Sequence, residues 1–135
     1  MSQLPDSLLE LIRLTSAEIP DDVHQSILTS LENEKKGTLA ESAMKIIDKN
    51  IAIAKNKSQP ICQDTGSILF YVNGPVGFDQ IAFTETAREA VKLATKKGFL
   101  RQNSVDSLTG KNDGTNCGPG APAFHFISIA RRKFP

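Results

Sequence analysis

Hydrophobic positions in the first part of the chain recur at the spacing of amphipathic helices. Residues 5–15 open with Pro-Asp-Ser and continue mainly with leucine and isoleucine, which predicts a short helix ending near Thr15. Pro20-Asp21-Asp22 starts a second helix, because acidic residues favour a helix N-terminus. Its apolar positions fall on one face and comprise Val23, Ile27, Leu28 and Leu31. Lys35-Lys36-Gly37 predicts its end, since cations and a following glycine typically close a helix.

A third helix is predicted from about Leu39 to Asn56. Thr38-Leu39-Ala40-Glu41 is a capping-box pattern and marks its start. Six positions form a broad apolar face, with Met44 at its edge: Leu39, Ala43, Ile46, Ile47, Ile51 and Ala54. Asp48 and Lys49 fall on the opposite side of the helix, which we expect to be solvated.

After the third helix, the spacing of the hydrophobic positions changes. Ser67–Val72 is a compact apolar and aromatic run bounded by glycine and proline turns, which predicts a strand. Thr84 is expected to begin a fourth helix that ends at Gly98 and turns its alanines and Val91 inward. A turn-rich loop follows from Asp106, and Ala123–Ile129 reads as a final strand. Helices come first and strands are scattered among them, so the predicted fold class is α+β.

Composition narrows the functional classes. The 135 residues suit one domain, and the net charge of +1 gives no electrostatic reason to expect nucleic acid or an acidic membrane as partner. No apolar run approaches the length of a membrane span, and the N-terminus lacks the pattern of a signal peptide. Two cysteines do not make a disulfide scaffold, so we expect a cytoplasmic protein with reduced thiols.

The chemically informative segment lies between the third helix and the first strand. It reads Gln59-Pro60-Ile61-Cys62-Gln63-Asp64-Thr65-Gly66 and places a thiol, an amide, a carboxylate and a hydroxyl in succession. Loops that lead into strands often carry functional residues, because the rigid elements position them. The residues alone also allow a plainer interpretation, in which the cysteine is a small buried residue and Asp-Thr-Gly a common turn.

This segment resembles the signature of the iron–sulfur hydro-lyases, which comprise class I fumarases and the α subunits of two-subunit fumarases and tartrate dehydratases. The resemblance continues through Gly98–Val105 and Leu108–Asn112 and ends in Gly118–Phe126. Several blocks in the same order are more specific than any one of them. The resemblance implies an incomplete hydro-lyase α-type domain over residues 1–135, with the divergent tail 127–135 outside the pattern.

The resemblance implies a role for four residues. In this family three cysteines hold a 4Fe–4S cluster, whose open iron position acts as a Lewis acid on the substrate. Cys62 matches the first cluster ligand. Gln63 and Asp64 match residues that face the substrate, and Asp64 either hydrogen-bonds the substrate or assists proton transfer. Arg101 matches an arginine that pairs with a substrate carboxylate, for which a guanidinium group offers a bidentate fork.

Cys117 and His125 are weaker candidates. Cys117 lies in the Gly/Asn-rich loop, and the resemblance places the other two cluster cysteines in segments that should follow residue 135. His125 lies between two phenylalanines in the last predicted strand and therefore points away from them. It either approaches the site or is structural. Thr65 and Gly66 are expected to shape the turn.

The resemblance implies a lyase that interconverts a 2-hydroxy dicarboxylic acid and its dehydrated product, such as malate and fumarate. We expect a truncated product that is inactive alone, does not assemble the cluster, and requires a β-type subunit or the missing C-terminal half. The alternative is a non-catalytic relic that pairs with a β-type subunit as an interaction module. A third possibility is a thiol-based redox or mononuclear metal protein that uses Cys62 and Cys117.

Overall fold

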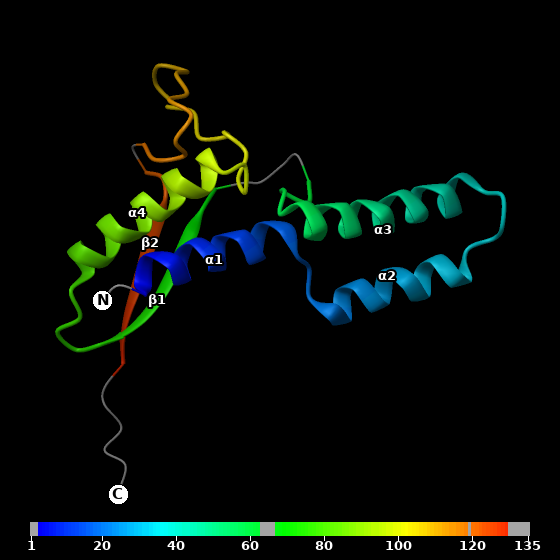
Figure 1. The fold of residues 1–135 in the computed structure, drawn as a ribbon, viewed down its shortest axis with the longest axis horizontal. Coiled ribbons are helices and arrows are strands. Elements are labelled where there is room, and N and C mark those ends of the chain that lie inside the picture. Colours follow the sequence, from blue (N-terminus) through cyan, green and yellow to red (C-terminus); the bar gives the residue numbers. More distant parts are fainter. Residues whose placement is uncertain (1–2, 63–66, 119, 130–135) are drawn as a thin grey trace, which may run out of the picture.

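The computed structural model describes residues 3–62, 67–118 and 120–129 and shows an α+β fold, as predicted. The helices α1 (Leu4–Ala17), α2 (Asp21–Asn33) and α3 (Leu39–Lys57) come first. They are followed by β1 (Leu69–Pro75), α4 (Gln80–Lys96) and β2 (Ala123–Ile129). In Figure 1, α1, α4 and the two strands form one body, from which α2 and α3 project as a hairpin. No described helix is long and apolar enough to cross a membrane.

The core lies between α1, α4 and one face of the sheet. α4 turns its small residues inward, and Ala87, Val91 and Ala94 are fully buried. Small side chains let α4 approach its neighbours closely, so Leu8 and Ile12 of α1 pack into the same cluster. The inward positions predicted for α4 are therefore confirmed, and this packing fixes the position of β1.

The strands β1 and β2 form a parallel pair connected through α4. Phe70 is opposite Phe124 in the register, and their rings stack at a centroid distance of 5.1 Å. Side chains alternate between the faces of a strand, so Tyr71 and His125 lie on the other face, with their rings stacked at 4.9 Å. One sheet face thus contributes aromatic rings to the core, and the other carries exposed side chains.

The helix α4 begins earlier than the sequence predicts. Its N-cap is Asp79, whose carboxylate accepts a hydrogen bond from the Ala82 N–H at 2.9 Å. Thr84, the predicted start, lies inside the helix and donates its hydroxyl to the Gln80 carbonyl at 2.8 Å. The predicted start was wrong because Asp79 and Thr84 are both residue types that cap helices well. The turn after β1 places Asp79 at the start of the helix. Gly98, with φ of +78°, ends the helix region as predicted.

The hairpin of α2 and α3 corrects the prediction for the apolar face of α3. Only Ile51 and Ala54 of that helix are buried, while Leu39 and Ile46 are 91% and 68% exposed. Asp48 lies on the side that meets α2, because its carboxylate is 2.8 Å from His24 Nε2. The face that packs on α2 is therefore rotated away from the most apolar face, which stays largely uncovered.

Candidate functional site

Cys62 lies just beyond α3, where the chain turns back toward the body. Ser58 caps the helix in a left-handed conformation with φ of +50°, and the Gln59 N–H donates to the Ala54 carbonyl at 3.1 Å. Pro60 follows and excludes further helix, as expected for a residue without an N–H group. The helix thus ends before the thiol, as the sequence predicts.

Three parts of the chain, namely α1, α3 and the segment after α4, donate to or accept from the backbone of Ile61 and Cys62. The Ile61 N–H donates to the Ser16 carbonyl of α1 at 3.0 Å. From α3, Asn50 Nδ2 donates to the Ile61 carbonyl at 2.6 Å. Arg101 Nε donates to the Cys62 carbonyl at 3.2 Å. Cys62 and Arg101, which the resemblance assigns to one site, are therefore in direct contact although 39 positions separate them.

The segment that carries Arg101 is fixed by one buried side chain, Asn116, which is 3% exposed. Its Oδ1 accepts hydrogen bonds from the backbone N–H groups of Asn103 and Ser104 at 2.9 and 3.1 Å. Its Nδ2 donates to the Arg101 carbonyl at 2.6 Å and to Thr95 Oγ1 at 3.0 Å. A fully bonded amide stabilises its surroundings, so Asn116 links the end of α4 to the Arg101 segment.

Sequence reasoning did not single out Asn116. The residue stands in a stretch rich in glycine and asparagine, where asparagine is usually an exposed turn residue. Its φ of +57° fits that expectation, but its burial does not. Only the packing of the loop against α4 distinguishes Asn116 from its exposed neighbour Asn112.

A groove of about 470 Å³ lies between α1, β1 and the Cys62 loop. Its walls come from the C-terminal half of α1, from Ile61 and Cys62, from the consecutive residues 67–71 and from Leu100. Cys62 is exposed and contributes to this lining. A ligand in this groove would lie beside Cys62.

Four residues of the predicted motif lie outside the described residues. They are Gln63, Asp64, Thr65 and Gly66. The roles expected for Gln63 and Asp64 therefore stay predictions, as does the turn expected at Thr65 and Gly66.

Cys117 occupies a different environment from Cys62. It is half-buried against the hydrophobic core, and its Sγ donates to the Arg88 carbonyl at 3.5 Å. Burial raises the pKa of the Cys117 thiol, because the charged thiolate is poorly solvated there. Metal ligation and redox exchange require the thiolate, so this environment favours a structural thiol. Among the described residues, no disulfide joins Cys117 to Cys62.

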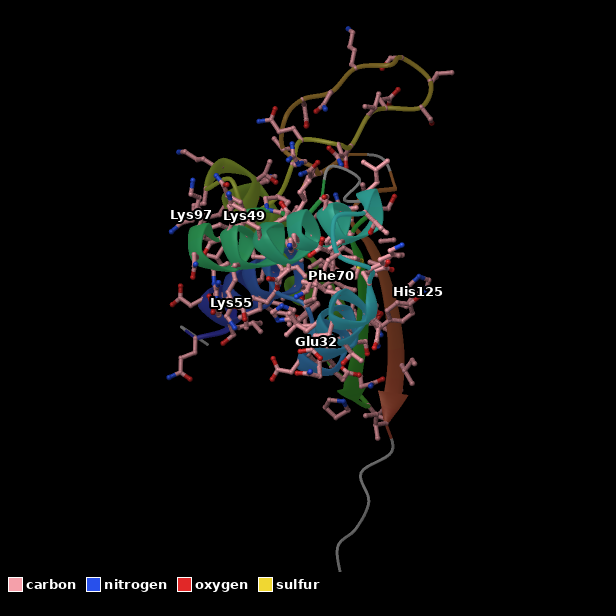
Figure 2. The ribbon with its side chains drawn as sticks, turned by 90° about the vertical axis from the view of Figure 1, so that its right-hand side faces the viewer. Glu32, Lys49, Lys55, Phe70, Lys97 and His125 are labelled. Atoms are coloured by element: carbon pink, nitrogen blue, oxygen red, sulfur yellow. The ribbon has the colours of Figure 1, made fainter. Side chains whose placement is uncertain are left out.

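His125 lies on the exposed sheet face, opposite to the phenylalanines, as predicted. Figure 2 shows it on the outer side of β2. Its ring stacks on Tyr71, which is 71% exposed and lines the groove. His125 thus touches the wall of the groove and is not itself part of the lining.

The donor set does not complete a 4Fe–4S cluster. The cluster that the resemblance implies takes three cysteines, whereas the sequence contains two. Within the described ranges, no group of three or more His, Cys, Asp or Glu side chains could hold a metal ion. If the resemblance holds for Cys62, the described residues would supply one thiolate to such a cluster.

Comparison with known proteins identifies the family. The sequence model described as Fumarate hydratase (Fumerase) matches residues 6–133. A Geobacillus stearothermophilus protein, provisionally named a class I fumarate hydratase, is 45% identical over 126 residues, which are 93% of this chain. A Methanocaldococcus jannaschii protein, provisionally named the α subunit of L(+)-tartrate dehydratase, is 33% identical over 94% of the chain. The L(+)-tartrate dehydratase α subunit of Escherichia coli K12 is 28% identical over 90%.

The chain spans less than half of these relatives' own lengths. The matched part is 24% of the Geobacillus protein, 44% of the Methanocaldococcus protein and 40% of the Escherichia coli subunit. The family match nevertheless extends over nearly the whole chain and reaches beyond Phe126. This chain belongs to the fumarate hydratase (Fumerase) family.

Proposed function

We propose that this chain forms the part of an iron–sulfur hydro-lyase that supplies one cluster thiolate and one substrate-binding arginine. It corresponds to the N-terminal part of the α-type catalytic domain, and the complete enzyme interconverts malate and fumarate or a related pair. The observation that carries the proposal is the hydrogen bond between Arg101 Nε and the Cys62 carbonyl at 3.2 Å. It brings two residues with complementary chemistry into contact beside the groove that Cys62 lines.

Arg101 suits the recognition of a dicarboxylic acid. Its Nε is occupied by the Cys62 carbonyl, and guanidinium groups carry further N–H donors on their terminal nitrogens. Those donors match the oxygens of a carboxylate in a bidentate arrangement. The side chain is exposed, so a substrate can reach it without displacing the core.

Cys62 suits the role of a cluster ligand because its backbone is held and its side chain is exposed. Asn50 donates a hydrogen bond to the Ile61 carbonyl, and Arg101 donates one to the Cys62 carbonyl. The peptide groups before and after the Cys62 Cα are therefore both held in place. A bound cluster would supply a Lewis-acidic iron for the substrate hydroxyl. Gln63 and Asp64 would face the substrate, with Asp64 as hydrogen-bond partner or proton carrier.

Turnover requires groups that this chain does not contain. The resemblance implies that the two further cluster cysteines lie in additional α-type sequence and that the β-type part brings further substrate-binding groups and the catalytic base. A non-catalytic interaction module that pairs with a β-type subunit is the alternative, since the same contacts would also stabilise a binding surface.

Anaerobic reconstitution with iron and sulfide tests the proposal. The purified chain is combined with the rest of the Geobacillus relative, and bound iron and fumarate hydration are measured. We expect four irons and hydration from the combination, in line with a family cluster. Cys62→Ser should abolish both, whereas Cys117→Ser, the matched control, should retain both.

Arg101→Met separates substrate binding from cluster assembly. Removing the guanidinium should lower hydration by about 100-fold or more, as expected for loss of a charged hydrogen-bond donor. The iron content should stay unchanged, because Ser16 and Asn50 still hold the peptide groups of Ile61 next to Cys62. A combination that associates but never hydrates fumarate would refute the enzymatic role and leave the interaction module.

A further inference from the structure

Among the described residues, only β2 pairs with β1, and the other edge of β1 has no neighbouring strand. Ala123 N–H donates to the Ile68 carbonyl at 3.0 Å, which sets the alternation of the parallel ladder. In such a ladder every second residue turns both peptide groups to the neighbouring strand. The peptide groups of Leu69, Tyr71 and Asn73 therefore point to the edge away from β2. In the described part of the chain, nothing accepts from or donates to them.

The groove runs along this same edge. Its lining includes the consecutive residues 67–71, and its opposite wall is α1, where Leu11 is 53% exposed. Cys62 belongs to the same lining. A chain segment lying in the groove would therefore meet backbone donors and acceptors on one side and apolar side chains on the other.

The open face of the sheet indicates that such a segment is protein. Leu69, Ile127 and Ile129 are each more than half exposed there. Parallel strands are normally covered on both faces and continue into further strands, because an uncovered edge and face leave hydrogen-bonding groups and apolar surface in water. More than half of each tartrate dehydratase relative lies outside the matched region, so the family contains sequence to fill this place.

We infer that the edge of β1 between Leu69 and Asn73 receives an extended segment from the remainder of the hydro-lyase, paired as a third strand. The inference rests on the proposed function, because it takes the occupant from the rest of that enzyme. Backbone hydrogen bonds supply the pairing, and alternate side chains enter the groove beside α1. Pro75 also points to this edge and has no N–H, so it limits pairing to the half of β1 nearest Cys62.

The added strand explains how a partner would complete the site. It would cover the groove that Cys62 lines, next to the loop whose Cys62 carbonyl accepts the hydrogen bond from Arg101. The surface is thus both a structural edge and one wall of the proposed active site.

Hydrogen exchange on the co-expressed complex tests this assignment. The full chain is co-expressed with the rest of the Geobacillus relative, and amide exchange is compared with that of the chain alone. We expect slower exchange at Leu69, Tyr71 and Asn73. Protection confined to the β2 edge, at Phe124, Phe126 and Ser128, would overturn the inference, and so would failure of the two polypeptides to associate.

Proline variants provide an independent test. Tyr71→Pro removes an N–H that points to the open edge and should weaken capture of the partner by about tenfold or more. Tyr71→Val keeps the N–H and removes only the ring, so it controls for the lost stack on His125. Ser128→Pro removes an N–H from the other edge. Both controls should retain capture, and equal losses in all three would contradict the assignment.

Circular dichroism of the isolated variants verifies that each remains folded. If Tyr71→Pro unfolds, hydrogen exchange on the wild-type complex alone decides whether the β1 edge is paired. Neither the exchange experiment nor the capture experiment measures bound iron or fumarate hydration. Association with β1 protection but no turnover would therefore refute only the enzymatic role, whereas turnover without β1 protection would refute only the added strand.

Discussion

Asn116 is the residue whose role depends most on its surroundings. Its amide satisfies backbone groups of Arg101, Asn103 and Ser104 in a position that water barely reaches. Leaving buried donors and acceptors without partners is costly, because their hydration is lost on folding and nothing replaces it. The geometry of the Arg101 segment therefore depends on one side chain outside the predicted motif.

Asn116→Ala should lower the free energy of unfolding by about 2–3 kcal/mol, since it leaves several backbone groups unsatisfied. Urea denaturation followed by circular dichroism measures this. The matched control is Asn112→Ala in the same loop, where the side chain is exposed and water can replace its hydrogen bonds. Equal losses in the two variants would show that burial of Asn116 does not matter.

The two thiols should differ in their reactivity. Burial raises the pKa of Cys117, so its thiolate fraction should keep increasing above the pH at which an ordinary thiol, with a pKa of about 8.5, is half ionised. In a Cys62→Ser chain, the rate at which iodoacetamide labels Cys117 should thus be low at neutral pH and rise only at alkaline pH. Cys62 in a Cys117→Ser chain should label faster at pH 7, because it is exposed. Equal labelling rates of the two thiols at pH 7 would contradict the structural assignment of Cys117.

At the scale of elements, the boundary of α4 shows why helix starts are difficult to predict. Asp79 and Thr84 both carry side chains that cap helices. Asp79 is used because the turn after β1 ends there, and it captures the Ala82 N–H at 2.9 Å.

Asp79→Ala should destabilise the fold by about 1 kcal/mol, the usual loss for an N-cap. Thr84→Ala should change stability by less than about 0.5 kcal/mol, because Thr84 is an exposed interior position of the helix. Thermal melts of the two variants measure both effects. A larger loss of stability for Thr84→Ala than for Asp79→Ala would support Thr84 as the start of α4, as the sequence predicts.

The α2–α3 hairpin illustrates a different difficulty. The helical ranges predicted for it agree with the structure to within a few residues. The contact face does not agree, because the hairpin pairs α3 with α2 through the His24–Asp48 contact and leaves Ile46 outside. Periodicity identifies an apolar face but not which neighbour meets it.

At the scale of the molecule, stability should be unevenly distributed. None of the residues of α2, all of which the structure describes, is buried, whereas α4 buries five. Segments with little buried apolar surface open at low free energy, so hydrogen exchange in the isolated chain should be fastest in the hairpin and slowest in α4. Mass spectrometry of exchanged peptides measures this order. Protection of α2 equal to that of α4 would mean that the hairpin and the body unfold together.

The sequence by itself determined the element types, the α+β class, the family and the candidate residues Cys62 and Arg101. These depend on local signals, namely caps, periodicity and short motifs, which are written in neighbouring residues. The tertiary structure alone decided that Arg101 touches Cys62, that Asn116 is buried, and that the peptide groups of Leu69 and Tyr71 face an open edge. Those facts join residues far apart in the chain, and the packing of α1, α4 and the sheet, not any local pattern, brings them together.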